Sequence, residues 1–115
     1  EDQITGEPLF RGRVGEELTL EQGYQAAREC AVIILGALKD TLGTLDKVER
    51  IVKAFALVNC GEKFTEVDEV MDGFSDTMAE VLEERGYHAR TVMGTRNLPN
   101  GNISVEVEVI VKVAG

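Results

Sequence analysis

The sequence is poor in aromatic and basic residues, and each shortage argues against a class of protein. It contains no tryptophan and only 5% aromatic residues, so its core must be built from aliphatic side chains. Twelve basic residues stand against 21 acidic ones, which gives a formal net charge of −9. Nucleic-acid binding depends on positive charge that displaces counterions from phosphates. The charge balance therefore argues against RNA or DNA as a partner.

Long hydrophobic runs and cysteine clusters are also missing. No apolar run approaches the roughly 20 residues that a helix needs to cross a bilayer, and the first residues do not resemble a secretory signal. Cys30 and Cys60 lack the spacing of metal ligands, and each is most simply a buried thiol. We therefore expect a single domain that makes no membrane contact and lies in a reducing cytoplasm.

The motifs of several enzyme classes are absent. The sequence has no glycine-rich phosphate-binding loop and no His/Cys cluster, so we expect no metal site. His88 is the single histidine. Nothing in the spacing of the residues supports a Ser/His/Asp arrangement.

The first half of the chain has the periodicity of one long amphipathic helix. Apolar residues recur every three or four positions from Leu20 to Leu42. Thr19 and Gln22 have the spacing of a capping box, which satisfies free backbone N–H groups at a helix start. Gly43 suits the left-handed residue that often ends a helix. The sequence therefore predicts a helix between these two signals.

A second helix is predicted over residues 65–85, with Gly86 as its stop. Six apolar residues form its expected buried stripe: Val67, Met71, Phe74, Met78, Val81 and Leu82. Between the helices, residues 51–58 form a nearly continuous apolar run, typical of a strand in the covered interior of a sheet. A weaker extended segment is expected at residues 9–14.

The last quarter of the chain predicts two strands. Residues 88–95 are rich in β-branched side chains, and residues 104–113 include a strict apolar/polar alternation. The connection contains Pro99 and Asn100-Gly101, which favour turns. We therefore expect these two strands to form an antiparallel pair.

This pairing would bring Arg90 close to the acidic residues of the last strand. Glu106 and Glu108 project from one face of that strand, about 6.5 Å apart. An ordinary cross-strand ion pair, worth about 0.2–1 kcal/mol, is one interpretation. An anion site is the other, because an arginine presents a rigid fork of donors to a carboxylate and a nearby glutamate can move a proton.

Helices that alternate with strands predict an α+β fold in which two helices cover one face of a mixed sheet. The other face would carry valine, alanine and glutamate side chains and would be too apolar for water. Pairing with copies of the same chain in a closed symmetric assembly would bury that face.

Two blocks of the sequence carry a family resemblance. The first is His-Ala-Arg-Thr-Val at residues 88–92, then Leu98-Pro99 and Val-Glu-Val-Glu at residues 105–108. The second is Gly-Arg-Val-Gly-Glu-Glu-Leu-Thr at residues 12–19, with Gly23-Tyr24 and Ala-Ala-Arg at residues 26–28. Together they resemble the RidA superfamily, also called YjgF or L-PSP, in a subgroup distinct from the archetypal imine deaminases.

The resemblance implies a chorismate-mutase-like fold, one domain over residues 1–115, and a homotrimer with a central β-barrel. It also implies that the N-terminal β-hairpin of the family is absent from this chain. The family activity is hydrolysis of reactive 2-imino acids and their enamine tautomers to 2-keto acids and ammonia, in a cleft between subunits and without a cofactor. The alternatives are a catalytically silent trimer that binds a small carboxylate metabolite, in a regulatory or chaperone-like role, and an endoribonuclease, which the net charge disfavours.

By the same resemblance, Arg90 binds the carboxylate of the substrate with Thr91 beside it. Glu106 is expected to position or deprotonate the attacking water. Asp68 stands where archetypal members often have asparagine and is expected near the substrate. Val92 departs from the archetype, which has a cysteine at that position.

Overall fold

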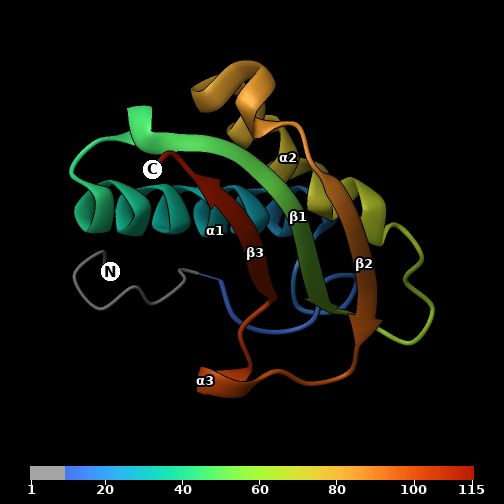
Figure 1. Ribbon diagram of the computed structural model, residues 1–115. Coiled ribbons are helices and arrows are strands. Elements are labelled where there is room, and N and C mark those ends of the chain that lie inside the picture. Colours follow the sequence, from blue (N-terminus) through green and yellow to red (C-terminus); the bar gives the residue numbers. More distant parts are fainter. Residues whose placement is uncertain (1–9) are drawn as a thin grey trace.

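The structure, a computed structural model, describes residues 10–115 (Figure 1). Its main elements follow the predicted order: helix α1 (Leu20–Leu42), strand β1 (Val48–Asn59), helix α2 (Val67–Leu82), strand β2 (Ala89–Thr95) and strand β3 (Val105–Val113). Two short helical turns lie between them, η1 (Leu45–Lys47) and η2 (Glu83–Gly86). The short segment α3 (Pro99–Asn102) connects β2 to β3, and its Asn100 and Gly101 have left-handed backbone angles.

Helix α1 begins and ends where the sequence predicts. The Thr19 hydroxyl accepts a hydrogen bond from the backbone N–H of Gln22 at 3.1 Å, and the Gln22 side chain accepts one from the backbone N–H of Thr19 at 2.9 Å. Gly43 has a φ of 86° and donates its N–H to the Lys39 carbonyl at 2.8 Å. At both ends of α1, backbone groups therefore find hydrogen-bond partners in residues that are close in the sequence.

Strand β1 is the centre of a three-stranded sheet with the order β2-β1-β3. β2 runs parallel to β1 and β3 runs antiparallel to it. The predicted antiparallel pair of residues 88–95 and 104–113 is therefore wrong, because β1 lies between these segments. Helix α2 connects β1 to β2, and a crossover helix is the usual connection between parallel strands.

The connection from β2 to β3 passes the end of β1 instead of forming a hairpin. The buried side chain of Asn59 holds this connection in place, since its Nδ2 donates to Asn102 Oδ1 at 2.9 Å and to the Ile103 carbonyl at 3.0 Å. The backbone N–H of Asn59 donates to the Ser104 carbonyl at 2.8 Å. The turn residues of this connection therefore let the chain cross from one edge of the sheet to the other.

The segment that precedes α1 lies at the same end of β1. The N–H of Gly12 donates to the Asn102 carbonyl and the N–H of Val14 to the Asn59 carbonyl, each at 2.8 Å. These contacts form isolated bridges, so the expected extended segment is not a regular strand. Leu9, its first residue, lies outside the described residues.

Both helices cover one face of the sheet, as predicted (Figure 1). Ala54, Ala56 and Val58 of β1 are fully buried beneath them. A register shift lies between Ile51 and Lys53, where Ile51 is buried and Val52 is exposed.

The opposite face of the sheet, which we call the open face, carries large apolar side chains together with polar ones. Met93 and Ile110 are 54% and 60% exposed, and the half-buried Phe55 and Leu57 lie between their strands. Exposed large apolar side chains that gather on one surface mark contacts with other molecules. Within residues 10–115, no helix is long and apolar enough to cross a membrane.

The two helices pack closely at Gly73, where a Cβ atom would collide with the backbone carbonyl of Tyr24. A Gly73→Ala substitution must push α1 and α2 apart. We expect it to lower the free energy of unfolding by about 1–3 kcal/mol, measured by urea denaturation followed by circular dichroism.

Gly36→Ala is the matched control, because Gly36 lies in α1 with open space around its Cβ position. We expect this variant to gain about 0.5–1 kcal/mol, since alanine restricts the unfolded chain. Equal stabilities of the two variants would contradict the close helix contact.

Candidate functional site

Arg90 lies on the edge strand β2 and points toward α2, on the helix-covered face. Its partner in the sheet is Ala54, whose side chain is buried beneath the helices. The guanidinium contacts Asp72 Oδ1 at 2.9 Å and donates to Ser75 Oγ at 3.1 Å. It also donates to the backbone carbonyl of Asp68 at 3.3 Å. Three acceptors on one helix therefore fix the orientation of a side chain that is 27% exposed.

Glu106 lies on the other edge strand, β3, and on the open face. Its partner is Leu57, which alternates with the buried Ala56 and Val58 and so faces away from the helices. The expected approach of Arg90 to Glu106 within one chain is therefore wrong. The cause is the strand order, which puts β1 between the two residues and leaves them on opposite faces.

The other two residues expected near the substrate are divided in the same way. Thr91 pairs with Phe55 and lies on the open face, as Glu106 does. Asp68 is exposed in the first turn of α2, and its backbone carbonyl accepts from Arg90. The structure thus brings Asp68 to Arg90 and leaves Thr91 on the face of Glu106.

Ser75 and His88 complete the cluster around Arg90. His88 Nε2 lies 3.0 Å from Ser75 Oγ, and Nδ1 lies 2.6 Å from the Gly86 carbonyl. Because a carbonyl only accepts, Nδ1 must carry the proton of the neutral ring, and Nε2 then accepts from the Ser75 hydroxyl. The Phe74 ring packs edge-on against the imidazole, with the ring centroids 5.5 Å apart.

A pocket of about 290 Å³ opens beside this cluster, and we call it the Arg90 pocket. Five residues line it: Ser75, Gly86, Tyr87, His88 and Arg90. Sequence reasoning found Arg90 but missed Ser75 and His88. They lie 13 residues apart, and only the packing of α2 against the start of β2 brings them together. A local sequence pattern could not have revealed this pair.

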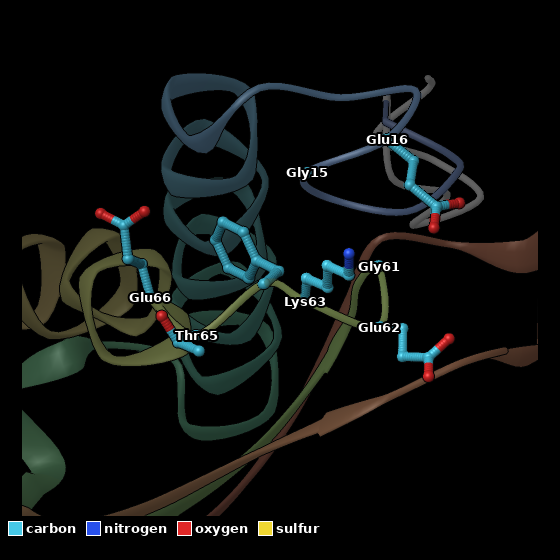
Figure 2. A pocket seen from close by; sticks show the side chains of 8 residues that line it. Gly15, Glu16, Gly61, Glu62, Lys63, Thr65 and Glu66 are labelled. Atoms are coloured by element: carbon cyan, nitrogen blue, oxygen red, sulfur yellow. The ribbon is translucent and has the colours of Figure 1, made fainter.

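A larger hollow of about 500 Å³ lies between the loop before α1 and residues 61–66 (Figure 2). Lys63 and three glutamates line it, with Glu66 at one end and Glu16 and Glu62 at the other (Figure 2). Its carboxylates therefore do not converge on one point. In the described part of the chain, no group of three or more His, Cys, Asp or Glu side chains could hold a metal ion. The Arg90 pocket is the better candidate site.

Burial removes both cysteines as candidate nucleophiles. Cys30 Sγ lies 3.6 Å from the Val105 carbonyl, and burial, followed by the charges of Glu29 and Glu106, raises the pKa of the Cys30 thiol to about 12. Burial also raises the pKa of the Cys60 thiol. Because the thiolate is the reactive form of cysteine, both residues should be inert near neutral pH.

Comparison with known proteins identifies the family. Residues 2–110 match the family model described as "YjgF/chorismate mutase-like, putative endoribonuclease". The chain therefore belongs to this family, the YjgF or RidA superfamily. It is 41% identical over 103 residues to the protein TCP17 of Trypanosoma cruzi, a match that covers 89% of this chain and 64% of that protein. The chain thus spans less than two thirds of the length of this relative.

Two solved structures share the fold. Atu1372 of Agrobacterium tumefaciens, a protein with unknown function, has a TM-score of 0.90 and 37% identity, covering 93% of this chain and 68% of that one. A "putative endoribonuclease" of Shewanella oneidensis MR-1 has a TM-score of 0.86 and 25% identity, covering 91% and 69%. The predicted α+β, chorismate-mutase-like fold with a mixed sheet is therefore confirmed.

The raised pKa of Cys30 predicts slow alkylation of the native protein. A pKa of about 12 in place of 9.0 lowers the thiolate fraction at about pH 8 roughly a thousandfold. We expect iodoacetamide to modify Cys30 far more slowly in the native than in the denaturant-unfolded protein, with the native rate rising as the pH increases from about 9 toward 12. Mass spectrometry of a Cys60→Ala variant assigns the rate to Cys30. Native and unfolded rates within tenfold of each other would contradict the pKa.

Proposed function

We propose that this chain forms a RidA-like hydrolase that converts reactive 2-imino acids, and their enamine tautomers, to 2-keto acids and ammonia. The observation that carries the proposal is the half-buried guanidinium of Arg90, which α2 holds at the wall of a 290 Å³ pocket. A 2-imino acid carries a carboxylate next to the reacting carbon. A guanidinium held in one orientation would bind that carboxylate and position the carbon for attack.

Arg90 retains donors for such a ligand. Its contacts with Asp72, Ser75 and Asp68 use three of the five N–H groups of a guanidinium. These contacts keep the side chain in place before a substrate arrives, which reduces the ordering cost of binding. Asp68 would act in this site mainly through its backbone carbonyl.

Hydrolysis also needs a group that handles protons. Water adds to the imine carbon, and the nitrogen takes up protons before it leaves as ammonia. Glu106 would position the water and accept its proton. Because β1 separates Glu106 from Arg90 in one chain, Glu106 must come from a neighbouring copy. Thr91, on the face of Glu106, would contact the substrate from that same copy.

A homotrimer whose sheets form a central barrel would provide this neighbour. Proteins of the family are generally small homo-oligomers. Faces that expose large apolar side chains, as the open face exposes Met93 and Ile110, mark contacts between subunits, and a closed ring buries the same face of every copy. The reaction uses water and these side chains and needs no cofactor. Two free thiols in the described chain fit a reducing compartment, and we place the activity in the cytoplasm.

The second candidate is a catalytically silent trimer that binds a small carboxylate through Arg90. The separation of Arg90 from Glu106 favours it, because one chain supplies the anion-binding group without the proton-handling one. The names of the family and of the Shewanella relative suggest endoribonuclease activity. That activity requires contact with the phosphates of RNA. A net charge of −9 disfavours that contact.

Ammonia release from imines that an amino-acid oxidase generates in situ tests the hydrolase. We expect Arg90→Ala and Glu106→Ala each to lower the rate by at least about 100-fold, the usual scale for a lost positioning or acid–base group. Arg50→Ala and Glu108→Ala are the matched controls, since they remove the same charges from other exposed positions of the sheet. We expect these controls to stay within about twofold of the wild type.

Equal ammonia release with and without the wild-type protein would overturn the hydrolase. Calorimetry would then decide between the alternatives. Binding of a 2-keto acid that is lost in Arg90→Ala would indicate the silent carboxylate binder. Retention of labelled RNA at physiological salt would indicate the endoribonuclease.

A further inference from the structure

Ser75 and His88 have the arrangement of a nucleophile and its base. Ser75 Oγ lies 3.0 Å from His88 Nε2, and both side chains line the Arg90 pocket. The Gly86 carbonyl, 2.6 Å from Nδ1, holds the imidazole in the tautomer whose Nε2 accepts a proton. A nucleophile next to a base that a third group orients is the recurring geometry of covalent catalysis.

The surroundings of this pair hold it rigidly. Gly86 packs so tightly against α2 that a Cβ atom would collide with the Met78 carbonyl, which fixes the position of η2 and of its own carbonyl. The Phe74 ring contacts the imidazole edge-on. Ser75 lies in the middle of α2 and is half-buried, so its backbone cannot move independently of the helix. Packing therefore determines the serine–histidine distance.

Arg90 adds a positive charge next to the nucleophile. Its Nη1 donates to Ser75 Oγ at 3.1 Å, and Asp72 holds the guanidinium in this orientation. A cation favours the ionised form of a neighbouring hydroxyl and stabilises negative charge that develops during attack. A serine oxygen has two lone pairs, so Ser75 can accept from Arg90 and still present one to a ligand in the pocket.

We infer that the Arg90 pocket is a serine-nucleophile site that hydrolyses small carboxylic esters. Ser75 Oγ bonds to the ester carbonyl carbon while His88 Nε2 takes the hydroxyl proton, and Arg90 faces the resulting oxyanion. The ester C–O bond then breaks, and His88 gives the proton to the leaving alkoxide, which departs as an alcohol. Water attacks the acyl-serine, His88 takes a proton from it and returns one to Ser75 Oγ, and the carboxylic acid leaves.

This activity shares Arg90 and its pocket with the imine hydrolysis proposed above but does not require that reaction. It uses Ser75, His88 and Arg90 of one chain and requires neither Glu106 nor a neighbouring copy. The two activities also release different products, an alcohol in one case and ammonia in the other. A failure of the ester hydrolysis can therefore be distinguished from a failure of the imine hydrolysis.

The test combines a fluorophosphonate probe, which bonds to an activated serine oxygen and releases fluoride, with release of nitrophenol from p-nitrophenyl acetate. We expect one probe per chain, located on Ser75 by peptide mass spectrometry. Ser75→Ala should abolish labelling, and His88→Gln should slow both labelling and nitrophenol release by at least about 100-fold. Thr41→Ala, an exposed hydroxyl on α1, is the control and should leave both rates unchanged.

Circular dichroism and size-exclusion chromatography confirm that each variant is folded and assembled as the wild type is. Nitrogen NMR of His88 in the wild type gives a second measurement, which does not depend on a variant, and we expect the proton on Nδ1. The inference would be overturned if the probe labelled no residue or a residue other than Ser75. It would also be overturned by labelling and nitrophenol-release rates that are unchanged in His88→Gln, or by a proton on Nε2. Ammonia release by Ser75→Ala then shows whether imine hydrolysis persists without this nucleophile.

Discussion

The position of β1 between β2 and β3 is the constraint on which the rest of this structure depends. Its hydrogen bonds to both neighbours use both edges of the strand, so the two outer strands cannot meet. Asn59, buried at its end, binds the connection that crosses from one edge to the other. Because of this arrangement, Arg90 faces α2 at one edge and Glu106 faces away from the helices at the other.

The Arg90 pocket follows from the parallel pairing of β1 and β2. That pairing requires a crossover, and the crossover helix α2 lies against β2, where Asp72 and Ser75 bind Arg90. The short turn after α2 then places His88 against Ser75. A single chain therefore completes an arginine–serine–histidine cluster, whereas the proposed imine hydrolysis by Arg90 and Glu106 would need a second copy. The open face offers the surface through which such copies would meet.

Local signals in the sequence predicted the helices, and longer-range relations were harder to predict. The capping box at Thr19 and the glycine at position 43 gave both ends of α1, because helix caps involve only neighbouring residues. The turn residues at Pro99 wrongly suggested a hairpin. Such residues suit a hairpin and a crossing between two sheet edges equally well, so they do not distinguish the two connections. Arg90 was singled out from an expected strand pairing that proved wrong, and its role was then assigned through a family resemblance. Ser75 and His88 became neighbours only through the packing of a helix on a strand. The strand–helix–strand order of β1, α2 and β2 is the sequence feature that favours their parallel pairing.

Mixing two inactive chains tests most directly whether neighbouring copies complete the site. Arg90→Ala and Glu106→Ala chains are unfolded together and refolded, mass spectrometry confirms that mixed oligomers have formed, and ammonia release is measured. In a closed ring with random mixing, about a quarter of the sites combine an intact Arg90 from one chain with an intact Glu106 from the next. The account predicts that about a quarter of the wild-type activity returns. Mixed oligomers that stay as inactive as either parent would contradict it.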